Sequence, residues 1–280
     1  MPGETLAIVA GSGVLPRLIA EDRAARGAPY VVVAFDGVDL DWTDGHPVVA
    51  AAFEKPGRVF SDLRARGCGT ITLAGGMRRP ELNPMRFDLK MMRLAPKIMG
   101  GLKAGDDSTL RMVTGILEGE GLTLRAPHEI LEDLLAPEGV LTTTRPDAAA
   151  GADADRAEAI VAALGAVDVG QGAVVAQGIC LAVETIQGTD AMLAAVAATP
   201  AGLRPDPANG AGILFKAPKP GQDWRVDLPS LGPATIAAAS AAGLAGIAFR
   251  AGGVLLLGRD ETIAAADAAG LFLWGREAGA

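Results

Sequence analysis

Short apolar runs that end in glycine alternate with helix-like segments at the start of the chain. Residues 5–10 form an apolar run that is too short for a helix and ends at Gly-Ser-Gly (11–13), which is typical of a buried parallel strand. Apolar side chains then recur at helical spacing over residues 15–26, and residues 30–35 form a second short apolar run. This repeated strand–helix winding predicts an α/β fold.

The same alternation continues to about residue 135. Residues 106–108 (Asp-Asp-Ser) are good helix-capping residues, and apolar side chains recur at helical spacing after them. In this part of the chain we expect a helix over 58–66, a strand over 70–74, a helix over 106–120, a strand over 122–125 and a short helix over 128–135. The strand over 70–74 ends at a pair of glycines, much as the first strand does.

A change of composition near residue 140 separates two α/β halves. Residues 137–155 are rich in Pro, Gly, Ala and Asp and interrupt the pattern. We therefore expect a domain over 1–136, a linker over 137–155 and a second domain over 156–280. Expected elements of the second domain are helices over 156–164, 190–198, 233–242 and 260–269, strands over 173–183, 211–217 and 271–274, and paired short strands near 246–250 and 253–257.

The composition is that of an acidic, folded protein. Half of the 280 residues are hydrophobic and 21% are charged, a balance that excludes intrinsic disorder. Lys and Arg number 25 against 33 Asp and Glu, so the net charge is −8. A chain of this charge lacks the basic field that non-specific nucleic-acid binding needs, and no nucleic-acid partner is expected.

The N-terminal residues and the cysteine content predict an intracellular protein. Met-Pro-Gly-Glu places no basic region ahead of an apolar stretch, so a secretory signal is not expected. Two cysteines are too few for a disulfide framework, so we expect them to be reduced. The nearly uncharged residues 231–249 are rich in Ala and Gly and contain Pro233, which makes them a poor membrane span. Any membrane contact is therefore expected to be peripheral.

Two glycine turns follow predicted strands and are candidates for phosphate or sugar binding. Backbone amides at the start of a helix can bind phosphate, and ligands of open parallel sheets bind beyond the carboxyl ends of strands. The candidate residues are Gly11, Ser12, Gly13, Gly75, Gly76 and Arg78. Pro16 stands where a dinucleotide fingerprint has Gly or Ala, which argues against NAD binding. Plain tight turns with solvated arginines are the alternative interpretation.

A dense polar segment lies between a predicted strand and an Ala-rich helix. Its candidate residues are Lys216, Lys219, Gln222, Asp223, Arg225 and Asp227. Lys and Arg can neutralise phosphate oxygens, and carboxylates can hold Mg²⁺ together with water and a substrate phosphate, as pyrophosphate cleavage requires. In an extended strand Asp223 and Asp227 would lie about 13 Å apart, so either the segment bends or only one of them binds the ion. We favour Asp227; a surface loop with internal salt bridges is the alternative.

Acidic residues also follow the predicted strand over 173–183. Glu184 and Asp190 stand at its carboxyl end, where catalytic residues of α/β proteins collect, and Thr189 lies beside them. Asp190 is equally suited to cap the next helix. If the polar segment over 216–227 faces this end of the sheet, the acids converge on one site.

In combination, these motifs resemble the LpxI family, the UDP-2,3-diacylglucosamine pyrophosphatases of Gram-negative lipid A synthesis. The resemblance covers nearly the whole chain. It rests on AGSGVLP at 10–16, GDD at 105–107 with Leu110-Arg111, DVGQG at 168–172, AVE at 182–184 with GTDAML at 188–193, and KPGQD at 219–223 followed by RVDLP at 225–229. Together these motifs are highly specific.

The resemblance implies a Rossmann-like N-terminal domain, a distinct α/β C-terminal domain and a lipid-linked nucleotide sugar held between them. It also implies Mg²⁺-dependent hydrolysis in which water attacks the α-phosphorus and releases UMP and 2,3-diacylglucosamine 1-phosphate (lipid X). Asp223 and Asp227 then resemble the catalytic or metal-binding acids of the family. The expected site has Lys216 and Lys219 as further catalytic residues, Glu184 and Asp190 as further metal ligands, and Gln171, Thr189, Gln222 and Arg225 as substrate-binding residues beside the glycine turns.

Three residues depart from the family pattern. Gln187, Ser230 and Arg250 stand where an acid, a threonine and a glutamate are expected, which weakens Gln187 and Arg250 as ligands. The acyl chains of the substrate need an apolar groove, for which residues 233–249 and the face of the first domain are both candidates.

We expect the protein to work in the cytoplasm in peripheral contact with the inner membrane, and a homo-oligomer is compatible with the sequence. A nicotinamide-dependent oxidoreductase is one alternative function, because of the α/β winding and the first glycine turn. A non-catalytic carrier of a lipid or nucleotide sugar is the other.

Overall fold

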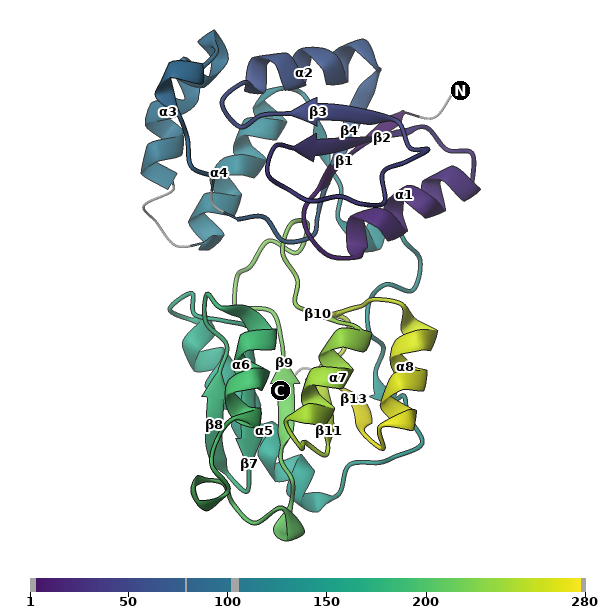
Figure 1. The fold of residues 1–280 in the computed structure, drawn as a ribbon, viewed down its shortest axis with the longest axis vertical. Helices are drawn as coiled ribbons and strands as arrows, with labels where there is room; N and C mark the ends of the chain where they lie inside the picture. The colour runs from purple at the N-terminus through teal and green to yellow at the C-terminus, as the bar shows by residue number, and fades with distance from the viewer. Residues whose placement is uncertain (1–3, 79, 102–105, 278–280) are drawn as a thin grey trace. The chain divides into compact units, whose positions relative to one another are not determined.

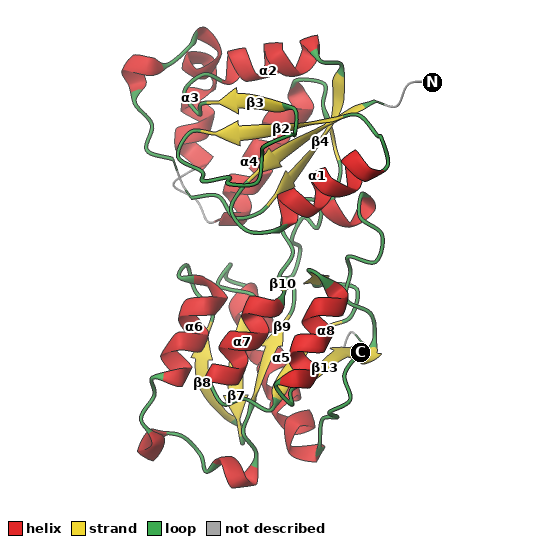
Figure 2. Ribbon diagram, turned by 45° about the vertical axis from the view of Figure 1, so that its right-hand side comes forward, coloured by secondary structure: helices red, strands yellow, loops and turns green. Residues whose placement is uncertain are grey.

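The computed structural model describes residues 4–78, 80–101 and 106–277. The chain forms two compact units, each of which can be followed in Figure 1 and Figure 2. Unit 1 comprises the residues up to Glu132 together with Asp223–Val226, and unit 2 comprises Asp133–Gln222 and the residues from Asp227 onward. Four residues of the polar segment thus belong to unit 1, whereas the sequence pattern places the whole segment in the second domain.

Unit 1 is built on a parallel sheet whose described strands follow the order β3-β2-β1-β4-β5. The strands are β1 (Thr5–Ala10), β2 (Tyr30–Phe35), β3 (Val48–Ala51), β4 (Cys68–Ala74) and β5 (Thr123–Leu124). The helices are α1 (Leu15–Ala25), α2 (Pro56–Ala65), α3 (Leu89–Gly101) and α4 (Asp106–Gly119), with the 3₁₀ turns η1 (Pro84–Arg86) and η2 (Pro127–Glu129). This strand order is Rossmann-like, as expected for the N-terminal half.

Local sequence explains most of unit 1. The apolar runs of β1 and β2 are buried in the sheet, which suits parallel strands covered by helices on both faces. Helix α1 starts with Pro16 in its first turn and buries Ile19. It is followed by Gly27, whose φ of +60° is a left-handed conformation that glycine adopts without a Cβ penalty.

Unit 1 differs from the sequence-based expectation in three places. Strand β3 is not among the expected elements: its four residues are all apolar in the sequence, and the sheet decides which of them are buried. Helix α3 escapes it because Pro96 lies inside the helix. The helix expected over 128–135 is wrong: only η2 forms near its start, and the positive φ of Asp133 (60°) is incompatible with continued helical winding.

Unit 2 contains a mixed sheet with the strand order β6-β13-β11-β9-β7-β8 among its described residues. Its strands are β6 (Gly139–Val140), β7 (Gly172–Ala176), β8 (Ile179–Val183), β9 (Ile213–Lys216), β11 (Gly246–Arg250) and β13 (Phe272–Arg276), and β10 (Ser230–Leu231) pairs separately with β12 (Leu255–Leu256). The helices are α5 (Ala148–Gly165), α6 (Gly188–Ala197), α7 (Pro233–Ala241) and α8 (Arg259–Ala268), with 3₁₀ turns η3 (Ala201–Leu203) and η4 (Pro207–Asn209). A second, distinct α/β fold is therefore confirmed.

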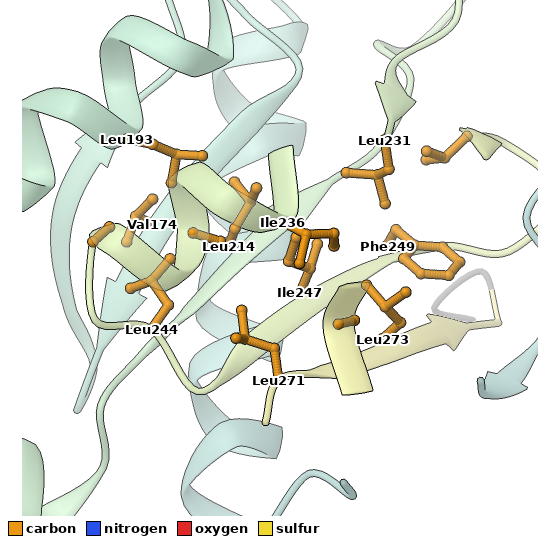
Figure 3. Close-up of a cluster of buried hydrophobic side chains, with 14 of the residues drawn as sticks. Val174, Leu193, Leu214, Leu231, Ile236, Leu244, Ile247, Phe249, Leu271 and Leu273 are labelled. Atoms are coloured by element: carbon orange, nitrogen blue, oxygen red, sulfur yellow. The ribbon is translucent and has the colours of Figure 1, made fainter. Parts of the chain in front are cut away.

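The sheet of unit 2 separates two apolar cores because successive strand residues point to opposite faces. One core, shown in Figure 3, combines Val174, Leu214 and Ile247 with side chains of α6, α7 and α8. The other combines Phe215 and Phe272 of the alternate positions with side chains of α5. Alternation along each strand thus decides which of the two cores a strand residue enters.

Three expectations for unit 2 are corrected by long-range pairing. The strand expected over 173–183 is a hairpin, β7 and β8, which turns at Gln177 and Gly178 with positive φ at both residues. Helix α5 begins at Ala148, capped by the side chain of Asp147, so residues expected in the linker are helical. Strands β11 and β12 do not pair with each other: β11 lies between β9 and β13, and β12 pairs with β10.

Residues 233–249 contribute to the core of unit 2. Ile236 of α7 and Ile247 and Phe249 of β11 are fully buried in it. Their apolar surface is used for folding, which removes this stretch as a candidate groove for acyl chains. Among the described residues, no helix combines the length and the apolar character that crossing a bilayer requires.

Candidate functional site

Three segments of unit 2 meet at one edge of its sheet. β7 runs antiparallel to both β8 and β9, and the register pairs Gly172 with Lys216 and Ala173 with Val183. The start of β7 therefore lies beside the ends of β8 and β9. This register brings together Gln171, which precedes β7, Glu184, which follows β8, and Lys216, which ends β9.

A buried ion pair occupies this edge. The ammonium Nζ of Lys216 lies 3.6 Å from Glu184 Oε2, and the side chain of Lys216 is 5% exposed. Thr189 connects the two: its hydroxyl accepts a hydrogen bond from Lys216 Nζ (2.7 Å) and donates one to Glu184 Oε2 (3.1 Å). Lys216 Nζ also donates to the Ser230 carbonyl at 3.3 Å. The ammonium is thus satisfied by three groups, as a buried charge requires.

Two glycines make room for Glu184. A Cβ atom on Gly170 would lie 2.0 Å from the Glu184 carbonyl oxygen, and one on Gly172 would lie 2.7 Å from Glu184 Oε2. Gly170 also has a φ of +58°, which favours glycine. The DVGQG motif therefore has a steric reason for its glycines: they admit the Glu184 backbone and carboxylate.

The carboxylate of Asp227 is held by two amides. Gln171 Nε2 donates to Asp227 Oδ2 at 2.9 Å, and Gln222 Nε2 makes a short hydrogen bond to the same oxygen. Lys219 N–H donates to Gln222 Oε1 at 2.7 Å, so the amide nitrogen of Gln222 must face Asp227. No hydrogen bond reaches Asp227 Oδ1 from any residue that the structure describes.

Burial raises the pKa of Asp227 above its ordinary value. Lys219, the amides of Gln171 and Gln222, and Lys216 act in the opposite direction but do not cancel the effect of burial. The result is a carboxylate that binds a proton more readily than an exposed aspartate does. This carboxylate has one oxygen fixed and the other available to a ligand or water.

Asp168 is a site residue that the sequence reasoning missed. Its Oδ1 accepts a hydrogen bond from Lys219 Nζ at 2.6 Å, so it holds the second lysine of the segment. Asp168 has a φ of +61°, a left-handed conformation that Asp tolerates better than most residues. An acidic residue ahead of the glycines of the DVGQG motif was the available signal.

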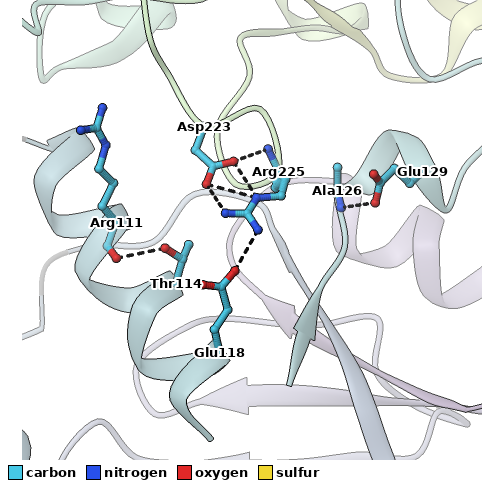
Figure 4. A network of polar contacts seen from close by, with 7 residues as sticks. All are labelled: Arg111, Thr114, Glu118, Ala126, Glu129, Asp223 and Arg225. Carbon is cyan, nitrogen blue, oxygen red and sulfur yellow. Dashed lines mark hydrogen bonds and ion pairs between the residues drawn. The ribbon is translucent and has the colours of Figure 1, made fainter. Parts of the chain in front are cut away.

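Asp223 and Arg225 occupy a different environment, within unit 1. The Arg225 guanidinium binds Asp223 in a bidentate manner (Nε to Oδ1, 2.9 Å; Nη2 to Oδ2, 2.7 Å) and donates through Nη1 to Glu118 Oε1 of α4 at 2.8 Å, as Figure 4 shows. The Val226 N–H donates to the Asp223 carbonyl at 3.1 Å, so the segment bends as a turn. Val226 packs against the apolar core of unit 1. These contacts fasten four residues of the segment to unit 1.

This network changes the expected roles of Asp223 and Arg225. Hydrogen bonds from Arg225 hold the pKa of Asp223 below its ordinary value, and the contacts with Asp223 and Glu118 raise that of Arg225. Asp223 is thus paired with an arginine two residues away. Arg225 is engaged by two carboxylates of the protein.

The expected convergence of four acids on one ion is not observed. Asp190 is exposed in the first turn of α6, where a negative charge suits the helix dipole, and Gln187 is the N-cap residue. Glu184 is bound to Lys216, and Asp223 to Arg225. Within the described part of the chain, no three His, Cys, Asp or Glu residues form a group that could hold a metal. Asp227 has no arginine or lysine within ion-pair distance among these residues.

The two glycine turns of unit 1 are joined to each other. Ser12 N–H donates to the Gly76 carbonyl at 2.7 Å, and Gly76 N–H donates to the Ser12 carbonyl at 3.0 Å. A Cβ atom on Gly11 would lie 2.4 Å from the Gly76 oxygen, and one on Gly75 would lie 2.3 Å from the Ser12 oxygen. The glycines are therefore required for this close approach, and the Ser12 and Gly76 amides are already used. Gly13 and Arg78 are exposed beside these turns, and Arg79 lies outside the described residues.

Comparisons with known proteins agree with this two-unit architecture. Residues 5–134 match the model of the LpxI N-terminal domain, and residues 137–274 match that of the LpxI C-terminal domain. The UDP-2,3-diacylglucosamine pyrophosphatase LpxI of Caulobacter vibrioides (strain ATCC 19089 / CIP 103742 / CB 15) is 38% identical over 270 residues, which cover 96% of each chain.

The chain belongs to the LpxI family. In this LpxI member two of the departures from the expected motif, Arg250 and Ser230, have identifiable surroundings. Arg250 Nη2 pairs with Glu158 of α5 at 2.6 Å, so it is a structural cation. Ser230 contributes its carbonyl to Lys216, a role that does not depend on the side chain. The comparisons lend no support to the nicotinamide alternative.

Proposed function

We propose that this LpxI family member hydrolyses the pyrophosphate bond of UDP-2,3-diacylglucosamine. Water attacks the α-phosphorus, the bond from that phosphorus to the bridging oxygen breaks, and the products are UMP and 2,3-diacylglucosamine 1-phosphate. The observation that carries the proposal is the match, over 96% of both chains, to a relative whose name states this substrate and cleavage. The polar edge of unit 2 supplies suitable chemistry for the same reaction.

Asp227 is the residue that we assign to the attacking water. Its Oδ2 is fixed by Gln171 and Gln222, so its Oδ1 has a defined direction in which to accept a hydrogen bond from water. Its raised pKa makes it a stronger base than an ordinary carboxylate, which favours removal of a proton from water. Gln171 and Gln222 are positioning residues in this account.

Lys216 and Lys219 are the cations that we assign to the diphosphate. Fixed positive charges near the leaving phosphate stabilise the charge that develops as the P–O bond breaks. Both ammonium groups are anchored before substrate binds, Lys216 by Thr189 and Lys219 by Asp168. A preorganised charge needs no rearrangement at the moment of reaction, which is the main source of such catalysis.

We also propose that Mg²⁺ binds together with the substrate. The described residues offer no group of three acids, so protein side chains alone do not make a full magnesium site. Mg²⁺ commonly uses one or two carboxylates and completes its shell with phosphate oxygens and water. We assign the ion to Glu184, which pairs with Lys216, and to Asp227, which is held by Gln171 and Gln222 at the same end of the sheet. The ion would supply additional neutralisation of the diphosphate charge.

A substrate with two acyl chains belongs to a lipid bilayer, so we propose that the protein works in the cytoplasm at the surface of the inner membrane. The structure describes no membrane-crossing helix, so this contact would be made by a surface of the folded protein.

UMP release from UDP-2,3-diacylglucosamine in detergent micelles tests the proposal. Wild-type protein with Mg²⁺ should release UMP, and Asp227→Asn should lower kcat by about 10²-fold or more, the range typical of a lost general base. Asp260→Asn is a matched control, because Asp260 is an exposed acid of α8 in the same unit. Substrate binding without UMP release by the wild-type protein would favour the carrier alternative.

Calorimetric titration of Mg²⁺ in the presence of UDP tests the proposed ion without turnover. Wild-type protein should bind the ion under these conditions, and Asp227→Asn should bind it more weakly. Equal Mg²⁺ affinity in the two proteins would remove Asp227 as a ligand.

A further inference from the structure

Unit 1 exposes a row of large apolar side chains along α3 and the turn before it. Met85 of η1 is 95% exposed, and Leu89, Met92 and Met99 of α3 are 76%, 61% and 59% exposed. Exposed Pro96 lies between the last two. Within α3 the spacing of 3, 4 and 3 residues is that of one helix face, so Leu89, Met92, Pro96 and Met99 form a single stripe, which we call the α3 stripe. Met85 precedes the helix and is separated from it by extended backbone at Phe87.

The α3 stripe is separate from the face that α3 uses for packing. Helix α3 contacts α2 and α4, and it lies beside them in Figure 1. Met91 is fully buried on that side, and Leu94 and Ile98 are partly buried. At about 100° per residue, the α3 stripe spans about 80° of the helix circumference, centred about 150° from the packed face. The core of unit 1 therefore does not use the side chains of the α3 stripe.

Basic residues border the α3 stripe along one side. Arg93 and Lys97 are exposed and fall within about 80° of its edge. Neither forms an ion pair with any residue that the structure describes. Lys90, farther round the same side, pairs with Glu120. The helix thus has a packed face, an apolar face and a basic face.

Residues 84–99, which include most of α3 and the turn before it, carry a net charge opposite in sign to that of the whole chain. Residues 84–99 contain four cations and one acid, a net charge of +3, whereas the whole chain carries −8. The one acid, Asp88, is occupied at the start of the helix: its Oδ1 accepts from Met91 N–H and its Oδ2 from Gly57 N–H, both at 2.7 Å. Of the four cations, Arg86 lies within ion-pair distance of Asp36 and Glu54, and Lys90 pairs with Glu120, so Arg93 and Lys97 are the cations that border the α3 stripe.

We propose that the α3 stripe and its basic border dock unit 1 on a bilayer that contains anionic lipids. A helix with an apolar face and a Lys/Arg-rich border lies in the plane of a membrane interface, with apolar side chains among the acyl chains and cations near the phosphates. An anionic bilayer is favoured over other partners by charge complementarity. An apolar stripe alone would suit many partners, but a basic border in an acidic protein suits an anionic surface. Methionine side chains are flexible enough to adapt to mobile lipids.

Docking on a bilayer would serve access to the lipid substrate, and in this respect it rests on the proposed function. The test of docking does not need that substrate. Vesicle binding can be measured without substrate, by co-flotation of the full-length protein with vesicles of phosphatidylglycerol and phosphatidylcholine. Vesicles of phosphatidylcholine alone provide the comparison without net negative charge. UMP release in detergent micelles is measured in parallel, so that failure of the proposed reaction and failure of docking give different results.

Two variants separate the apolar and the basic contributions. Leu89→Gln with Met92→Gln and Met99→Gln removes the apolar stripe, and Arg93→Glu with Lys97→Glu reverses the border. All five side chains are exposed, so folding should be retained, as thermal unfolding would verify. Leu203→Gln with Arg145→Glu is the matched control, because both side chains are exposed on unit 2.

The wild-type protein should bind anionic vesicles, more weakly with added salt and far more weakly without phosphatidylglycerol. Each basic residue near an anionic surface changes affinity about fivefold, so reversing two should lower it by at least about 25-fold. The apolar variant should also lose binding, while the control binds as wild type does and all variants release UMP in micelles. Absence of wild-type binding, or equal binding by all variants, would overturn the proposal. Self-association through this face without vesicle binding, seen by sedimentation velocity, would overturn it in favour of a second copy.

Discussion

Replacing Thr189 by valine tests whether the buried ion pair depends on a hydroxyl bridge. Thr189 accepts from Lys216 Nζ at 2.7 Å and donates to Glu184 Oε2 at 3.1 Å, and valine has the same shape but neither function. The change removes two hydrogen bonds to charged groups and leaves the packing volume nearly unaltered. Thr189→Ser is the matched control, because it keeps the hydroxyl and removes only a methyl group.

The expected loss of unfolding free energy depends on the contacts that the Lys216 ammonium keeps. Lys216 keeps the Ser230 carbonyl at 3.3 Å and Glu184 at 3.6 Å, so it stays paired but loses its shortest contact. A hydrogen bond to a charged group contributes about 1.5–3 kcal/mol, and we expect Thr189→Val to lower the free energy of unfolding of unit 2 by about 2–3 kcal/mol. Thr189→Ser should cost less than about 1 kcal/mol, the value of one methyl group.

Urea unfolding followed by tryptophan fluorescence measures this difference in one unit. The chain has three tryptophans, of which Trp42 and Trp224 belong to unit 1 and Trp274 to unit 2. Replacing the first two by phenylalanine leaves Trp274 as a reporter of unit 2, which matters because two units need not unfold together. A loss below about 0.5 kcal/mol in Thr189→Val, or an equal loss in Thr189→Ser, would refute the hydroxyl bridge.

Three further outcomes are expected. Gly170→Ala places a Cβ 2.0 Å from the Glu184 carbonyl oxygen and should lower the free energy of unfolding by about 1–3 kcal/mol, measured in urea, as overpacking does. Wild-type stability would contradict the steric role of this glycine. Asp168→Asn releases Lys219 and should lower kcat/KM about tenfold in UMP release, equivalent to about 1.4 kcal/mol; an unchanged value would remove Asp168 as a positioning residue. The pKa of Asp223 is lower in the folded than in the unfolded state, so its ion pair stabilises unit 1 at pH values above the unfolded-state pKa, about 4. This stabilisation is lost as the pH falls through the folded-state pKa. The difference in urea midpoint between wild type and Asp223→Asn should therefore shrink in acid, and a pH-independent difference would contradict this account.

The position of each side chain at the site could be assigned only with the tertiary structure, although its residue types were evident beforehand. The motifs single out Gln171, Gln222 and Asp227, but Gln171 and Asp227 are 56 positions apart, and nothing local shows that both glutamines bind one carboxylate oxygen. Asp223 and Asp227 illustrate the opposite case. They are neighbours in one motif, yet packing of Val226 and the pairing of Arg225 with Glu118 place Asp223 in unit 1 and leave Asp227 in unit 2.

The sequence by itself determined the elements that local patterns encode. The apolar runs of β1 and β2, the helix between them and the glycine that follows that helix are set by burial and backbone freedom over a few residues, so they could be predicted. Tertiary structure alone decided that β12 pairs with β10, that β7 and β8 form a hairpin, and that the apolar stretch at 233–249 lies in the core. Strand pairing and the choice of ion-pair partner depend on residues distant in the chain, and local periodicity carries no information about them.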